Sequence, residues 1–253
     1  MTEASLYDLL CHAWIVLAIV AGIILFRTPA PYGRHTWTNA GPEISGSLGW
    51  MSMESVSLAV FIVVFLAGPR RGELVPLTFG TWWVAHYAHR AFVQPIRQWD
   101  RRRAMPLFIV LAGAIFNVIN ASLNARWLTA LGPARSSAWL GTPAFAGGAV
   151  LLVVGAAINV RSDETLLALR TGGGGEYGIP RGFLYRWLSC PNYLGEIIEW
   201  TGWAIATWSM AGVSFAVWTA ANLVPRARAH HQWYRARLPG YPRERRALIP
   251  GVF

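Results

Sequence analysis

The stretch Pro191-Asn192-Tyr193-Leu194-Gly195-Glu196-Ile197-Ile198-Glu199-Trp200 opens an apolar segment and decides the fold that the sequence predicts. If Asn192 caps a helix, Glu196 and Glu199 lie on one side of its first two turns, because residues three and four apart are neighbours. Ionisable groups at membrane depth are costly and normally face the interior of a helix bundle. The stretch therefore predicts a membrane helix with a functional polar face. The alternative is a pair of interfacial carboxylates that bond to neighbouring helices.

The composition of the whole chain agrees with a membrane protein. Of 253 residues, 54% are hydrophobic and only 13% are charged, with a mean hydropathy of +0.36. The net charge of +10 comes from arginine alone, since the sequence contains no lysine. The arginines form short clusters between apolar runs, which favours cytoplasmic loops, anionic lipid head groups and phosphate ligands over nucleic acid. Cys11 and Cys190 share no metal-ligand spacing, so we expect no metal site.

Seven apolar segments are long enough to cross a hydrocarbon core of roughly 30 Å as helices. They cover about 9–26, 48–68, 77–93, 106–127 and 145–160, and two more begin near Tyr193 and near Gly212. The sequence thus predicts an all-α integral membrane protein, a seven-transmembrane-helix bundle that forms a single membrane domain over 1–253.

The distribution of arginine predicts the orientation of this bundle. With the N-terminus outside, the loops that begin at Arg27, Arg97 and Arg161 and the C-terminal tail all lie inside. These segments hold most of the arginines, as the positive-inside rule requires. We therefore expect a cytoplasmic C-terminus. The expected location is the inner membrane of a bacterium, or the endoplasmic reticulum if the source is eukaryotic.

Polar residues recur inside the predicted helices. Asn117, Asn120 and Asn124 project from one face of the fourth apolar segment, and Asn159 lies near the end of the fifth. Such side chains can simply bond neighbouring helices together. Three asparagines in register with a fourth nearby favour the other interpretation, a polar ligand that lies along the bundle.

The third apolar segment carries His86-Tyr87-Ala88-His89-Arg90. A buried Tyr87 hydroxyl requires a partner, and Glu54 of the preceding segment is within topological reach. A phenol beside a carboxyl group can polarise a carbonyl oxygen and pass it a proton. The alternative is an aromatic residue of the membrane interface, with Arg90 extending outward.

The longest polar stretch runs from 161 to 191 and contains four consecutive glycines, Gly172 to Gly175. It matches neither a Walker loop nor a dinucleotide-binding fingerprint, so by itself it is a flexible hinge. Because Arg170, Arg181 and Arg186 flank it, the stretch also suits a lid over a phosphate-bearing cofactor. The tail adds further arginines, which fit either this cofactor or anionic lipid.

Together these residues resemble the steroid 5α-reductases, and the chain is similar to a bacterial member of that family. The resemblance covers most of the chain from the second apolar segment on. It is carried by the following motifs: His86-Tyr-Ala-His-Arg90, Asn120, Asn159-Val-Arg-Ser-Asp163, Arg170, Tyr177-Gly-Ile-Pro-Arg-Gly182, Pro191 to Trp200, His230-His231 and Tyr241-Pro-Arg-Glu-Arg-Arg-Ala-Leu-Ile-Pro250.

The resemblance implies a monomeric seven-helix bundle that holds NADPH and reduces the conjugated double bond of a 3-oxo-Δ4 steroid. Residues 1–95 would supply the substrate-side helices, and 105–253 the NADPH-binding helices, the cytoplasmic loop 161–191 and the tail. Tyr87 and Glu54 would contact the 3-oxo group. The residues implied for the cofactor are Arg90, Asn120, Asn124, Asn159, Asp163, Arg170, Tyr177, Asn192, Glu196, Glu199, His230, Tyr234 and Arg245.

Two departures from the family pattern bear on specificity. Met53 stands where the animal enzymes carry Gln, so Glu54 lacks one expected polar neighbour, and Gly178 replaces a basic residue, so Arg181 would supply that phosphate contact. Three alternative functions are an enoyl-thioester reductase, an isoprenylcysteine-type methyltransferase and a lipid carrier without enzymatic activity. A methyl transfer needs no carbonyl-polarising residue, so Tyr87 and Glu54 discriminate against it.

Overall fold

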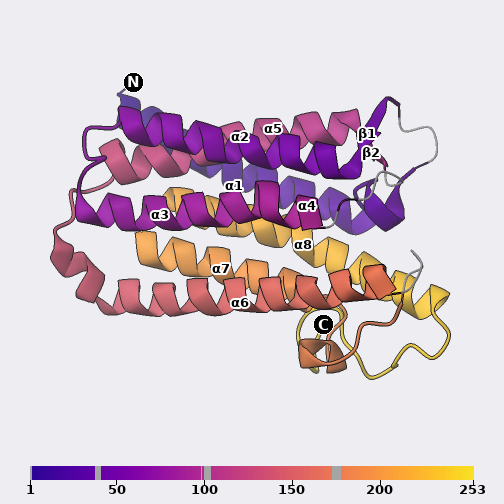
Figure 1. Ribbon diagram of the computed structural model, residues 1–253. Helices are drawn as coiled ribbons and strands as arrows, with labels where there is room; N and C mark the ends of the chain where they lie inside the picture. Colours follow the sequence, from indigo (N-terminus) through magenta and orange to yellow (C-terminus); the bar gives the residue numbers. More distant parts are fainter. Residues whose placement is uncertain (1, 38–40, 98, 100–103, 173–177) are drawn as a thin grey trace. The chain divides into compact units, whose positions relative to one another are not determined.

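A computed structural model of the chain describes residues 2–37, 41–97, 99, 104–172 and 178–253, with side chains up to 169 in the fourth of these ranges (Figure 1). The described chain is mostly helical. Its helices are α1 (Glu3–Arg27), α2 (Gly46–Ala67), α3 (Leu74–Ala88), α4 (Gln94–Arg97), α5 (Leu107–Arg126), α6 (Pro143–Gly172), α7 (Pro191–Thr207) and α8 (Met210–Arg237), and its strands are β1 (Glu43–Ser45) and β2 (Ala104–Pro106).

Four of the described helical segments are long and apolar enough to cross a membrane: Glu3–Arg27, Gly46–Ala67, Leu107–Leu131 and Pro143–Leu169. They coincide with the first, second, fourth and fifth of the predicted apolar segments. The backbone forms two compact units: Met1–Cys11 with Ala30–Pro143, and His12–Pro29 with Ala144–Phe253. The first unit contains α2 to α5, and the second contains α6 to α8.

In the first unit, α2 and α5 run parallel and side by side (Figure 1). The antiparallel pair β1–β2 sets their register, because Ile44 pairs with Met105 immediately before the two helices begin. Glycine allows the close approach: a Cβ added at Gly113 of α5 would lie 2.7 Å from Sδ of Met53. The short sheet departs from the all-α prediction. Three-residue strands carry too little alternation to be recognised in the sequence.

An aromatic stack joins α2 to α3 within the same unit. The rings of Phe61 and Trp83 lie 4.7 Å apart and nearly parallel, and Trp83 lies 4.9 Å from Tyr87. All three side chains are buried. Beyond α3 the chain continues through a π-helical turn, His89–Val93, into α4. The stack therefore fixes the end of α3 that carries Tyr87.

In the second unit, α6 and α7 are antiparallel and pack through paired glycines. A Cβ at Gly148 would lie 2.5 Å from the backbone nitrogen of Ala206, and one at Gly155 would lie 2.3 Å from that of Glu199. Gly195 and Gly202 of α7 meet the backbone of α6 in the same way. Small residues are the usual means by which membrane helices approach backbone to backbone. Gly195, within the stretch that opens the sequence analysis, thus brings the start of α7 against Asn159.

Three boundaries differ from the sequence-based prediction. Residues 161–172, predicted as the start of a loop, instead continue α6, because 161–171 contains no proline or glycine and an Arg161–Glu164 pair at 3.7 Å supports the helix. Residues assigned to the tail from 226 form the last turns of α8, which continues through Pro225. Asn192 does not cap α7: Cys190 precedes the helix and Pro191 takes its first position, where a proline needs no N–H partner.

The C-terminal segment, residues 238–253 after α8, is hydrogen-bonded to the chain just before α7. Ser189 donates its backbone N–H to the carbonyl of Arg246 at 2.8 Å, and Cys190 donates to that of Ala247 at 3.1 Å. Arg246 in turn donates to the carbonyl of Trp187 at 2.9 Å. These bonds bring residues about 57 positions apart in the sequence into one small parallel bridge. The tail is therefore part of the packed second unit.

Candidate active site

Glu54 is a buried carboxylate on α2 that pairs with an arginine on the segment after α3. Nε of Arg90 lies 3.6 Å from Oε1 of Glu54, and the two side chains are only 15% and 11% exposed. The guanidinium also lies over the indole of Trp50, 5.0 Å from its centroid. A charge inside an apolar helix is tolerated only when it is paired in this way. Arg90, which the resemblance assigns to the cofactor, thus lies beside the carboxylate.

Tyr87 is 3% exposed and lies at the end of the aromatic stack described above. His86 packs edge-on to its ring at 5.1 Å. This burial contradicts the alternative in which Tyr87 and Arg90 belong to an exposed aromatic belt. The phenol and the Glu54–Arg90 pair both come from the α2–α3 side of the first unit. A buried phenol held by stacked rings has little rotational freedom, which suits a hydrogen-bond donor to one fixed oxygen.

The three asparagines of α5 are all buried but have different partners. Asn117 donates from Nδ2 to the carbonyl of Met53 at 2.7 Å and is also a neighbour of the Glu54 carboxylate. It therefore provides a polar neighbour to Glu54 although Met53 cannot. Asn124 donates to the carbonyl and the Oδ1 of Asn120. Nδ2 of Asn120, fully buried, has no hydrogen-bond partner among the described residues, so this donor is available to a ligand.

In the second unit, α6 and α7 bring three predicted residues together. Asn159 donates from Nδ2 to the carbonyl of Asn192 at 3.0 Å, and Asn192 donates from its own Nδ2 to Oδ1 of Asp163 at 3.0 Å. The bonds cross between the helices directly beside Gly195. The structure thus places these three residues in contact, and Asn192 bonds to Asp163 rather than capping its own helix. A carboxylate offers several acceptor positions, so Asp163 can also accept from a hydroxyl group of a ligand.

A second group in this unit surrounds His230 of α8. Arg226 donates from Nε to the hydroxyl of Tyr193 at 3.2 Å, and that hydroxyl lies 3.3 Å from Nδ1 of His230. The tyrosine oxygen accepts from Arg226, and the tautomer of His230 sets the direction of the bond between the hydroxyl and Nδ1. The ring of Tyr193 also packs against that of His230 at 5.5 Å. His230 is 8% exposed, so the chain of bonds holds a nearly buried imidazole in one orientation.

Tyr234 and Arg245 meet through Tyr241. The rings of Tyr234 and Tyr241 stack at 5.2 Å with an interplanar angle of 3°, and the guanidinium of Arg245 lies 5.1 Å from the centre of the Tyr241 ring. Arg245 is only 4% exposed, and its Nε and Nη1 have no hydrogen-bond partner among the described residues. A buried guanidinium with two unsatisfied nitrogens is suited to a phosphate or carboxylate group.

Three further predicted residues, Glu196, Glu199 and Arg170, lie on the same two helices, α6 and α7. Glu196 is half-buried near the start of α7, and Glu199 is 1% exposed where α6 passes it. Arg170 lies in the last turns of α6. Tyr177 lies outside the described residues, as do Gly173, Gly174 and Gly175 of the glycine run.

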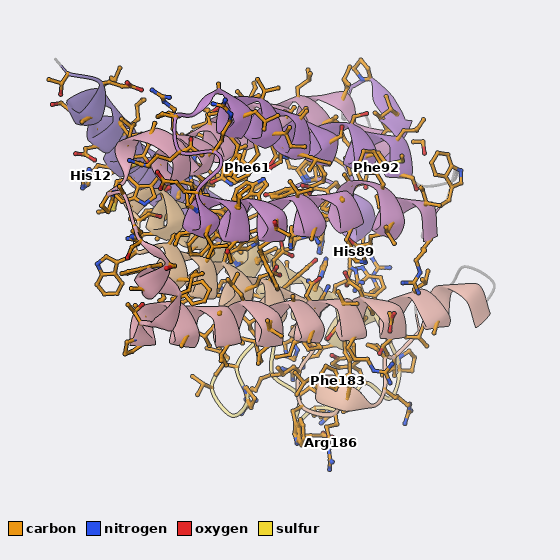
Figure 2. The ribbon with its side chains drawn as sticks, turned by 60° about the vertical axis from the view of Figure 1, so that its left-hand side comes forward. His12, Phe61, His89, Phe92, Phe183 and Arg186 are labelled. Carbon is orange, nitrogen blue, oxygen red and sulfur yellow. The ribbon has the colours of Figure 1, made fainter. Side chains whose placement is uncertain are left out.

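Two flanking arginines proposed for the lid are exposed. Arg181 and Arg186 lie on the surface of the second unit, and Arg186 lies over the Trp187 ring at 4.5 Å. Figure 2 shows Arg186, like its neighbour Phe183, on the short helical turn Phe183–Arg186, with its side chain extending away from the helices. Of the described cationic residues in this unit, the buried Arg226 and Arg245 are therefore better placed to bind an anion than Arg186.

Ser189 and Tyr241 are the polar residues that sequence reasoning missed. Oγ of Ser189 lies 2.6 Å from Nδ1 of His231 and 2.6 Å from the hydroxyl of Tyr241. Burial raises the pKa of Tyr241, although Ser189 and Arg245 oppose the rise, so this phenol keeps its proton. Tyr185, also buried, donates to the carbonyl of Ser162 at 3.3 Å. The sequence offered only an indirect signal, because Ser189 lies just before the motif that begins at Pro191 and Tyr241 begins the motif that ends at Pro250. The two residues meet because the backbone around Ser189 is hydrogen-bonded to the backbone around Arg246.

Comparison with known proteins places the chain in a family. The family model for 3-oxo-5-alpha-steroid 4-dehydrogenase matches residues 103–253. The chain is 36% identical to Steroid 5-alpha-reductase DET2 of Solanum lycopersicum over 100% of its own length and 99% of that protein's. It is 34% identical to 3-oxo-5-alpha-steroid 4-dehydrogenase 1 of Rattus norvegicus (100% and 97% covered) and 32% identical to the protein of the same name from Homo sapiens (90% and 88%). The chain belongs to the 3-oxo-5-alpha-steroid 4-dehydrogenase family.

Proposed function

We propose that this protein is a membrane oxidoreductase that reduces the Δ4 double bond of 3-oxo-Δ4 steroids to 5α-reduced 3-oxo steroids, with NADPH as the hydride donor. The observation that carries the proposal is the match over the full chain to proteins named steroid 5-alpha-reductases. The geometry of each unit supports it separately, because each contains a buried polar cluster that suits one of the two reactants.

The first unit supplies the groups that would polarise the steroid. Hydride addition at C5 of the enone builds negative charge on the 3-oxo oxygen, so a donor to that oxygen stabilises the transition state more than the ground state. Tyr87 is assigned this role, with its ring held by Trp83. Glu54, fixed by Arg90 and Asn117, orients the oxygen and the phenol. The enolate that forms then takes up one proton at C4 from water, so one hydride and one proton are added across the double bond.

The second unit supplies groups that fit a dinucleotide. Arg245 offers two unsatisfied guanidinium nitrogens for a phosphate group, and Asp163 with Asn192 offers a carboxylate and an amide for hydroxyl groups. His230, Tyr234, Glu196 and Arg170 are assigned to the same ligand. When bound, the nicotinamide supplies the hydride. We assign NADPH rather than NADH because the second unit is rich in arginine. NADPH carries one phosphate group more than NADH, and that group needs a further cation.

Two residues of the first unit complete the assignment. Asn120 offers a buried amide donor without a partner among the described residues, and we assign it to the cofactor. Asn124 holds Asn120 in place through its bond at 2.9 Å to the Asn120 carbonyl. In α7, Glu199 is assigned to the geometry of the helix rather than to the ligand, because its backbone nitrogen lies where Gly155 of α6 passes.

We also propose that the chain crosses the membrane seven times, with its N-terminus outside and its C-terminus in the cytoplasm. The four apolar helical segments support this arrangement. The other three spans would be formed by α3 with the turn that follows it, by α7, and by α8 up to Pro225. The arginine-rich end of α8 and the C-terminal segment would then lie on the cytoplasmic side, in the membrane of a bacterium or the endoplasmic reticulum. The proposed form is a monomer.

The family favours this reaction over the alternatives that the sequence left open. A methyl transfer would not require the buried Tyr87 or the Glu54–Arg90 pair. An enoyl-thioester reductase would use the same chemistry on a different carbonyl compound and is the nearest competitor. A lipid carrier would require no donor to a carbonyl oxygen.

Incubation of the purified protein with NADPH and a panel of 3-oxo-Δ4 steroids tests the proposal. The expected result is loss of NADPH absorbance that depends on the steroid, with a 5α product identified by its stereochemistry. An enoyl-thioester in the same assay is the matched competitor. Oxidation of NADPH by the thioester alone, or a 5β product, would contradict the assignment.

A further inference from the structure

Ser189 lies at the centre of a small network that the proposed reaction does not use. Its hydroxyl oxygen is 2.6 Å from His231 of α8 and 2.6 Å from Tyr241 of the C-terminal segment, and Ser189 itself precedes α7. Ser189 is 2% and Tyr241 is 7% exposed. The Ser189 hydroxyl therefore joins the chain just before α7 to two residues that lie 42 and 52 positions further along the chain.

Tyr241 connects this network to two residues assigned to the cofactor. One face of its ring stacks on Tyr234 at 5.2 Å, and the guanidinium of Arg245 lies 5.1 Å from its centre. Arg245 is buried, two of its nitrogens have no partner among the described residues, and its side chain hydrogen-bonds to that of Tyr241. The position of Tyr241 therefore determines where Arg245 presents its charge.

The protons in the network can be counted. A serine hydroxyl has one proton, so Ser189 can donate to only one of its two partners and must accept from the other. If Nδ1 of His231 is unprotonated, Ser189 donates to it and Tyr241 donates to Ser189. All three groups are then satisfied, and the Tyr241 hydroxyl points away from Arg245.

Protonation of His231 reverses this direction. Nδ1–H then donates to Ser189, and Ser189 donates to the oxygen of Tyr241. The Tyr241 proton must find another acceptor, and Arg245, its cationic neighbour, cannot accept a hydrogen bond. The charged groups that face His231 are Arg235 of its own helix and Arg246 of the C-terminal segment. Burial, and after it these two arginines, lower the pKa of His231 below its ordinary value of 6.5, so the first arrangement is the one present at neutral pH.

We propose that Ser189, His231 and Tyr241 are positioning residues that fix Arg245 for a phosphate group of the cofactor, and that they do so only while His231 is neutral. The inference rests on the proposed function, since it names what orients one residue of the proposed cofactor site. It predicts that the network affects the affinity for the cofactor and leaves the chemical step unchanged.

The test measures NADPH binding to the purified full chain by fluorescence, without steroid, at about pH 8 and about pH 5.5. Ser189→Ala and Tyr241→Phe each remove one hydrogen bond and should weaken binding at about pH 8 by about fivefold to tenfold. Turnover with saturating NADPH and steroid should stay within about twofold of the parent. Ser214→Ala and Tyr7→Phe are matched controls. Each removes a buried hydroxyl that donates to a backbone carbonyl outside this network, so binding should not change.

His231→Asn separates a positioning role from a merely structural one. Its amide oxygen can accept from Ser189 as Nδ1 does, but it does not titrate, so the affinity at about pH 8 should be retained. On acidification the parent should lose several-fold more affinity than His231→Asn, while the titration of the NADPH phosphate is common to both.

Equal pH dependence in the parent and His231→Asn would overturn the inference, as would unchanged binding by folded Ser189→Ala and Tyr241→Phe. These outcomes would leave the proposed function intact. If the parent bound no NADPH at either pH, the proposed function itself would fail, and the inference with it.

Discussion

Glu54 and Tyr87 show at the scale of single residues why the candidate site must be buried. Each is a polar residue within an apolar helix. Arg90 forms an ion pair with Glu54, and the ring of Trp83 packs against that of Tyr87. A donor that is already oriented before the substrate arrives needs no reorganisation during the reaction. The sequence marks both residues as candidates, because each is a polar group in an apolar segment, and their roles remain predictions.

Replacing Tyr87 by Phe tests the proposed donor. We expect turnover to fall about 10²-fold to 10⁴-fold, the usual effect of removing a positioned acid, while NADPH binding stays close to that of the parent. The ring remains, so the stack with Trp83 is preserved. Steady-state kinetics and a separate binding titration measure the two effects. The matched control is Tyr7→Phe, which removes a buried hydroxyl from the first unit and should keep full turnover. Full turnover in Tyr87→Phe would remove this residue from the reaction.

A double-mutant cycle tests the Glu54–Arg90 pair. Arg90→Met alone should destabilise the fold by about 3–5 kcal/mol, because it leaves Glu54 buried and uncompensated. Adding Glu54→Gln should restore much of that loss, which gives a clearly non-additive cycle. Thermal unfolding in detergent provides the measurement. The exposed pair Arg161–Glu164 is the control and should give a coupling close to zero. Additive effects at Glu54 and Arg90 would show that the two charges do not interact.

At the scale of elements, the glycines of α6 and α7 determine how closely these two helices approach each other. They bring the two backbones together, and this contact aligns Asn159 and Asp163 of α6 with Asn192 of α7. Gly195 therefore belongs to the candidate site although it touches no ligand. The sequence marked Gly195 as part of a motif but gave no indication of its partner, because the approach depends on the register between two helices.

Two adjacent glycines in α6 offer a matched test of this packing. Gly148→Ala should destabilise the protein by about 1–3 kcal/mol, because the new Cβ would lie 2.5 Å from the backbone of Ala206, which cannot move aside alone. At Gly147 no atom lies within 4 Å of the added Cβ, so Gly147→Ala should be neutral or stabilise the helix by up to about 1 kcal/mol. Thermal unfolding compares the two variants. Equal stabilities would contradict the close packing of α6 against α7.

The helices were more predictable from the sequence than their ends. Apolar runs located the four membrane-length segments, because hydropathy and length suffice to recognise them. The end of α6 at Gly172 and the end of α8 at Arg237 were missed, since both helices continue through charged residues that hydropathy assigns to loops. The strand pair β1–β2 was missed as well, because its partners are about 60 residues apart and each strand is only three residues long.

At the scale of the whole molecule, the candidate site is assembled from distant parts of the chain. The family resemblance implied Asn159, Asp163 and Asn192 as residues of one cofactor site. It could not predict that Ser189 and Tyr241 would be joined by two hydrogen-bonded backbones. Contacts of this kind follow from the tertiary fold, so only the structure reveals what holds Tyr234 and Arg245 in place.

The stability of the whole chain should depend on pH in a specific way. The folded protein lowers the pKa of His231 from 6.5, so the unfolded chain binds more protons below that value and stability falls as the pH falls through it. Burial raises the pKa of Tyr241 above 10.0, so the stability it contributes is present below 10.0 and is lost as the pH rises further. Melting temperatures should therefore be highest between about 6.5 and 10. His231→Asn should flatten the acidic side, and an unchanged acidic slope would exclude His231 as its source.

The most direct test of the central claim is a single reaction with deuterium in the transferable position of NADPH and a 3-oxo-Δ4 steroid as substrate. Hydride transfer to the enone predicts that one deuterium appears at C5 on the α face of the product, while C4 acquires a proton from water. Mass spectrometry and NMR of the product identify both positions. A product without deuterium at C5, formed while NADPH is consumed, would contradict the assignment of this protein as a steroid Δ4 reductase.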